Sequence, residues 1–173
     1  LLFKPLIYDY THASRPTGGD YFNALTYASH FAKHLSNPAT GWLSFWNEGI
    51  PIVGGYPVAI FYLMAPFFES MDPATAMETF GIVSQLVFLL ASLILFFKIS
   101  RSSIISLVLT FILFHTKATY YQLASEGLVV GAGTQWLQPF TLIFLFLFLD
   151  THNSKFLILT AIFSGVSLIF HPA

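Results

Sequence analysis

Apolar residues form four long runs in the second half of the chain, and short polar segments separate them. A membrane-spanning helix needs about 20 mostly apolar residues, and the shorter runs approach that length once their flanks are included. We therefore predict an all-α fold, a polytopic transmembrane helical bundle. Its helices are expected at 80–97, 102–118, 134–149 and 156–171, with residues 1–8 as the end of an earlier spanning helix.

Positive charges indicate which way these helices run. Lys98 and Arg101 lie between the first two runs, and Lys155 lies between the last two. Short cytoplasmic loops carry an excess of Lys and Arg, so we expect both of these loops to face the cytoplasm. Residues 9–79 then form a large first extracytoplasmic loop, and residues 116–135 form a smaller second one.

One further apolar stretch, Ile50 to Phe68, differs from the four runs. It contains Pro51, Pro57 and Pro66 as well as two adjacent glycines, a density that argues against a regular spanning helix. If this stretch did span the membrane, both cationic loops would face outward. We interpret it as a juxtamembrane element at the outer leaflet, with a spanning helix as the alternative.

An amphipathic helix is predicted within the first outer loop, from Asp20 to Leu35. Polar residues recur there at spacings of three and four, which places them on one stripe of a helix. The stripe comprises Asp20, Asn23, Tyr27, His30 and His34. Gly18 and Gly19 break the chain ahead of this helix, so Asp20 can cap its first turn. Asp72 can likewise cap a later helix that starts at Pro73.

Composition agrees with a membrane protein and excludes several functions. Hydrophobic residues make up 55% of the chain and charged residues only 9%, against roughly 25% charged residues in a soluble domain. The net charge of −1, with seven scattered Lys and Arg residues, argues against nucleic acid as a partner. The absence of cysteine removes thiolate chemistry and Cys-containing zinc sites. The chain starts without Met and stops after an apolar run, so we expect the N-terminal part of a longer integral protein of the cell membrane.

Carboxylates are concentrated on the predicted outer side of the membrane. Of the eight Asp and Glu residues, only Asp150 falls on the predicted cytoplasmic side. Ordinary solvation of a loop explains most of the others. Asp20 and Glu126 are the candidates for chemistry, because Glu126 is expected close to the membrane surface, where an unpaired carboxylate is costly and usually has a partner or a function.

Histidine and arginine could complete a site on the same side. His30 and His34 are four residues apart on the predicted helix, a spacing that lets two imidazoles reach one metal ion, with Asp20 or Glu48 as a further ligand. A solvated helix face explains the same pair. Arg15 offers a bidentate fork for a phosphate group, although it is explained equally well as an anchor to lipid headgroups. A divalent metal ion is the one cofactor that these residues leave open.

The order of short motifs in the outer loops resembles a known family. Gly19-Asp20-Tyr21 leads the amphipathic helix, and Trp42 to Trp46, Gly49-Ile50-Pro51 and Gly55-Tyr56-Pro57 follow. Glu126 then lies in a tyrosine-preceded second loop, Gln138-Pro139 opens the next helix, and His171 follows the last one. This order is similar to that of the GT-C superfamily of membrane glycosyltransferases, and most closely to the membrane domain called 6-pyruvoyl-tetrahydropterin-synthase-related.

The resemblance implies transfer of a sugar from a polyprenyl-phosphate donor to an acceptor on the extracytoplasmic side, with membrane lipid around the protein. Asp20 would be the catalytic base and Glu126 a second acid or a metal ligand. The residues expected to bind substrate are Arg15, Glu48, Trp46, Tyr56, His30 and His171. Many GT-C members have two adjacent acids in the first loop, whereas Tyr21 follows Asp20 here. Two alternatives therefore stay open, a non-catalytic membrane scaffold of the same fold and a lipid or polysaccharide transporter.

Overall fold

The structure is a computed structural model, and it describes residues 19–33, 42–43, 50–51, 59–115 and 135–170. Two strands of two residues each, β1 (Trp42–Leu43) and β2 (Ile50–Pro51), pair antiparallel. Nearly all other described residues belong to helices. These helices are α2 (Gly19–Lys33), α3 (Ala59–Ser70), α4 (Pro73–Ser100), α5 (Ser103–Phe114), α8 (Leu137–Thr151) and α9 (Ser154–Phe170). The described part of the chain is therefore all-α, as the sequence predicted.

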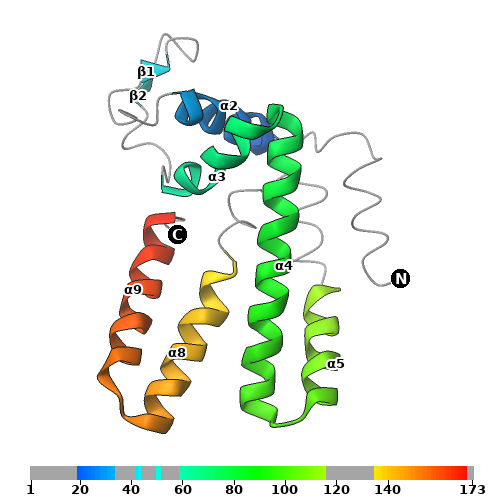
Figure 1. Cartoon of the computed structure of the whole chain (residues 1–173), viewed down its shortest axis with the longest axis vertical. Helices are drawn as coiled ribbons and strands as arrows, with labels where there is room; N and C mark the ends of the chain where they lie inside the picture. Colours follow the sequence, from blue (N-terminus) through cyan, green and yellow to red (C-terminus); the bar gives the residue numbers. More distant parts are fainter. Residues whose placement is uncertain (1–18, 34–41, 44–49, 52–58, 116–134, 171–173) are drawn as a thin grey trace.

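The helices form a lengthwise set and a crossing pair (Figure 1). In the lengthwise set, α4 packs between α5 and α8, and α9 packs on α8. The crossing pair, α2 and α3, lies over the end of α4 that begins at Pro73. The short loops 101–102 and 152–153 both lie at the opposite end, which we call the loop end, and we call the other the α2–α3 end.

The longest helix is α4, with 28 residues. At its start the Asp72 side chain accepts a hydrogen bond from the Thr75 N–H at 3.2 Å, which confirms the predicted cap. Pro73 occupies the first helical position, where its missing N–H costs nothing. The helix thus begins at Pro73 rather than at residue 80, and the segment predicted as outer loop is correspondingly shorter.

Length separates α4 from the other apolar helices. It extends for about 42 Å, and no charged residue lies between Glu78 and Lys98. Helices α5, α8 and α9 have 12, 15 and 17 residues, fewer than the roughly 20 that a complete crossing needs. Within the described residues, α4 is thus the one helix long and apolar enough to cross a membrane by length and composition.

The two short loops share one construction. Helices α4 and α8 are each followed by a residue with a left-handed backbone, Arg101 (φ 56°) and His152 (φ 50°). Their N–H groups donate to carbonyls four residues back, at 2.9 and 2.7 Å. The next residue caps the following helix, because Ser102 Oγ and Asn153 Oδ1 each accept a backbone N–H from its first turn, at 3.4 and 3.1 Å. Such tight connections bring consecutive helices side by side as antiparallel hairpins.

The largest hydrophobic cluster lies at the α2–α3 end. It joins both crossing helices to the start of α4 and to the first residue of α8, and Phe163 and Val166 of α9 pack against it. Because these residues come from five helices, the cluster fixes the position of the crossing pair on the lengthwise set. Its buried members are Tyr27, Ala28, Phe31, Ile60, Phe61, Met64, Met77, Phe80 and Leu137.

Candidate functional site

The second half of α2 holds that helix against α3 through aromatic rings. Tyr27 stacks on Phe61 with ring centroids 5.4 Å apart and planes at 12°. Phe31 lies 5.6 Å from the same Phe61 ring and meets the edge of Tyr62 at 5.4 Å. Aromatic pairs at these separations add about 0.5–1.5 kcal/mol to the burial of their area. The side chain of Phe61 therefore anchors the predicted amphipathic helix.

Tyr27 corrects one detail of the predicted amphipathic pattern. We assigned it to the polar stripe, but only 5% of its surface is exposed. The ring is an apolar body, and its stacking on Phe61 outweighs the polarity of the hydroxyl. Burial also raises the pKa of the phenol. The buried face of α2 consequently includes Tyr27 together with Ala28 and Phe31.

Asp20, the predicted base, lies in the first turn of α2. The helix begins at Gly19, so the Asp20 backbone is already helical and the residue does not occupy the predicted capping position. Phe61 contacts α2 about two and three turns further along, at Tyr27 and Phe31. The start of this helix is thus held indirectly, through the packing of Tyr27 and Phe31. The side chain of Asp20 lies outside what the structure describes.

His30 is the one predicted substrate-binding residue whose side chain the structure describes. It lies in the last turn of α2 and is partly buried, next in sequence to the buried Phe31. Its predicted metal-binding partner His34 falls outside the described residues. Across the described ranges, from residue 19 to residue 170 with their gaps, no three His, Asp or Glu side chains gather as a metal site would require.

The remaining site predictions cannot be placed, because the residues concerned lie outside the described ranges. The structure thus neither brings Asp20 and Glu126 together nor separates them. It does describe the helix next to one of these residues in the sequence. Helix α9 ends at Phe170, immediately before His171, and its last turns lie near α3 (Figure 1). The residues outside the described ranges are Arg15, Trp46, Glu48, Tyr56, Glu126 and His171.

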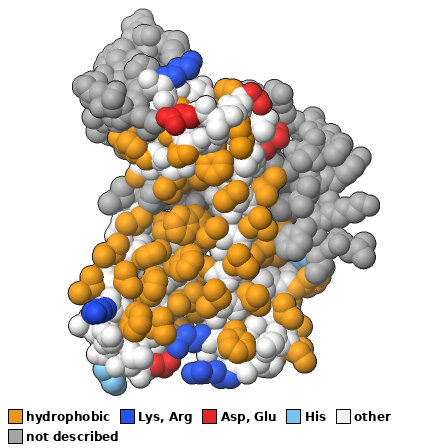
Figure 2. All heavy atoms as spheres, in the orientation of Figure 1, with side chains coloured by type: hydrophobic (Ala, Val, Ile, Leu, Met, Phe, Trp, Pro, Cys, Tyr) orange, Lys and Arg blue, Asp and Glu red, His pale blue; other side chains and the backbone are white. Residues whose placement is uncertain are grey.

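Most of the described acidic side chains lie at one end of the lengthwise helices, and most of the described basic side chains lie at the other. Three described carboxylates lie at the α2–α3 end, on Glu69 in the last turn of α3, on the cap Asp72 and on Glu78 near the start of α4. Lys33, the last residue of α2, is a described cation at the same end. Figure 2 shows a broad band of hydrophobic side chains between the two charged ends.

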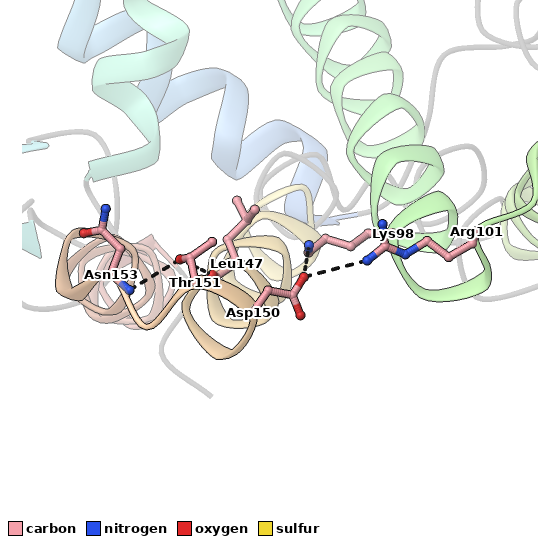
Figure 3. A network of polar contacts seen from close by, with 6 residues as sticks. All are labelled: Lys98, Arg101, Leu147, Asp150, Thr151 and Asn153. Atoms are coloured by element: carbon pink, nitrogen blue, oxygen red, sulfur yellow. Dashed lines mark hydrogen bonds and ion pairs between the residues drawn. The ribbon is translucent and has the colours of Figure 1, made fainter.

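A polar network occupies the loop end (Figure 3). Lys98 Nζ donates to Asp150 Oδ2 at 2.6 Å, and the Arg101 guanidinium lies 3.9 Å from the same oxygen. These contacts join the end of α4 to the end of α8, 52 residues later in the sequence. In the last turn of α8, Thr151 Oγ1 donates to the Leu147 carbonyl at 2.6 Å and accepts the Asn153 N–H of the α8–α9 turn at 3.4 Å.

The lysine also affects the pKa of this carboxylate. The hydrogen bond from Lys98 lowers the pKa of Asp150, partial desolvation opposes this effect, and the charges of Lys98 and Arg101 add to the lowering. The side chain of Asp150 is about half exposed, at 48%, so water and salt weaken the pair. The pair therefore links the ends of α4 and α8 but contributes little to stability.

Sequence reasoning missed this contact, although a signal for it existed. We noted Asp150 as the single carboxylate on the predicted cytoplasmic side but did not pair it. The predicted topology already placed both Asp150 and Lys98 at the same membrane surface, each at the end of a helix. The predicted topology therefore indicated a shared surface for these opposite charges, although it could not show that they are in contact.

Comparison of the chain with protein families, with curated proteins and with solved structures gives no match. The resemblance to GT-C glycosyltransferases therefore rests on the order of motifs in the sequence.

Proposed function

We propose that α4, α5, α8 and α9 cross a membrane as part of a multi-pass protein. The loop end faces the cytoplasm, and α2 and α3 lie at the extracytoplasmic surface. The exposed apolar side chains along the lengthwise helices support this proposal, among them Leu90 at 61%, Ile104 at 76% and Ile158 at 59% exposure. A soluble monomer rarely exposes so large an apolar surface, because contact with water is unfavourable, whereas lipid accommodates it.

The charges agree with this orientation. The loop end contains Lys98, Arg101 and Lys155. Cytoplasmic loops typically carry such an excess of positive charge. Between Glu78 and Lys98, α4 offers about 28 Å of uncharged helix, close to the thickness of a bilayer core. The shorter helices α5, α8 and α9 are compatible with a bilayer that thins locally around them.

On the extracytoplasmic side, the chain acts as a glycosyltransferase that uses a polyprenyl-phosphate-linked sugar. Asp20 accepts the proton of an acceptor hydroxyl while that oxygen bonds to the anomeric carbon of the sugar. The bond from this carbon to the phosphate oxygen breaks, and the lipid phosphate departs with the electron pair. The position of α2 supports this role, because its aromatic packing holds the helix that carries Asp20 at the α2–α3 end, away from the cationic loops.

The role of Glu126 as a second acid follows from the resemblance alone. A divalent metal ion would stabilise the departing phosphate by charge, and carboxylates are ligands that it prefers. Among the residues that the structure describes, no three His, Asp or Glu side chains gather as such a site would require.

Replacing Asp20 by Asn in the full-length protein tests the reaction. An amide cannot accept the proton, so glycan transfer should fall by about a hundred-fold or more, with expression and membrane insertion unchanged. Glu69→Gln is the matched control, because Glu69 is an exposed acid at the same end of the molecule. The readout is mass spectrometry of surface glycans in cells that carry the variant as their only copy. Full transfer by Asp20→Asn would reject Asp20 as the base.

The transporter alternative receives no support from α4. Transporters bind their substrates at broken helices near the midplane of the membrane, whereas α4 continues from Pro73 to Ser100 with its single proline at the first position. A non-catalytic scaffold transfers no sugar, so this alternative predicts unchanged surface glycans in both Asp20→Asn and Glu69→Gln.

A further inference from the structure

We draw no further inference here: the strongest candidate, the open apolar groove that Leu93, Phe97 and Leu107 line between α4 and α5 near the loop end, carries nothing because no contact among the residues that the structure describes shows what covers it.

Discussion

The two ends of the lengthwise helices are closed by different kinds of interaction. At the loop end, two-residue turns, backbone caps and a partly exposed ion pair join neighbouring helices. At the α2–α3 end, rings that are far apart in the sequence pack together, and Phe61 and Phe31 are 0% and 1% exposed. Exposed charge pairs and caps contribute little each, whereas a buried ring contributes several kcal/mol. Single truncations should therefore cost far more at the α2–α3 end.

The largest effect is expected from Phe61→Ala. This change removes the ring against which both Tyr27 and Phe31 pack, so the free energy of unfolding should fall by about 3–5 kcal/mol. Leu63→Ala on the same helix is the matched control, because Leu63 is 40% exposed. Denaturant titration of the protein in detergent measures both. Equal losses would show that the aromatic cluster is not what holds α2 on α3.

A smaller loss of stability is expected from Asp72→Ala, which removes the cap of α4 at the same end. The Thr75 N–H would lose its acceptor, at a cost of about 1 kcal/mol. Asp72→Asn keeps a side-chain oxygen in place and should recover most of that loss. Hydrogen exchange at the first turn of α4 reports the effect directly. A loss as large as that of Phe61→Ala would contradict the distinction between local and long-range interactions.

The parts of the fold that depend on local pattern could be predicted from the sequence. Apolar runs indicated where helices form, and Asp72 before Pro73 indicated the start of α4. The packing of Tyr27 on Phe61 could not be predicted, because the residues lie in separate helices and a tyrosine suits a polar or a buried face equally well. The start of α4 also differs from the predicted one. The charge of Glu78 ends the apolar run, so the hydrophobic pattern placed Glu78 in the loop, whereas the helix already begins after the Asp72 cap.

The candidate site was predicted less completely than the fold. The position of Asp20 on a helix followed from the spacing of polar residues, but its partnership with Glu126 follows only from the resemblance. A contact between residues so far apart in the sequence would depend on tertiary structure, which local patterns do not encode, and Glu126 lies outside the described residues. The Lys98–Asp150 pair is intermediate, because topology predicts the shared membrane surface but not the contact itself.

A modest gain in stability is expected from Gln85→Met in the middle of α4, between the two ends. Gln85 is 2% exposed, and neither polar atom of its amide has a hydrogen-bond partner among the residues that the structure describes. An unpaired buried amide costs about 1–3 kcal/mol, and methionine has a similar shape without that cost. The free energy of unfolding should rise by about 1 kcal/mol. A fall would indicate that Gln85 hydrogen-bonds to a ligand or to another part of the protein.

The smallest effect on stability is expected from lowering the pH, through protonation of Asp150 at the loop end. Because the pKa of Asp150 is lowered by Lys98, the stabilisation from this pair is present above the ordinary pKa of aspartate, about 3.9, and is lost as the pH falls through the lowered value. Wild-type protein should unfold at a slightly higher temperature than Asp150→Asn at pH 6, and the difference should vanish in stronger acid. A difference that does not change with pH would mean that charge is not its source.

The orientation of the helices in the membrane is tested most directly by cysteine labelling, since the chain itself contains no cysteine. Single cysteines would be placed at Ser70, at the end of α3, and at Ser154, at the start of α9, in a full-length protein without other cysteines. An impermeant thiol reagent applied to intact cells should label the cysteine at position 70, and should label that at position 154 only after permeabilisation. Labelling of both positions from the same side would contradict the proposed orientation and, with it, the extracytoplasmic site for sugar transfer.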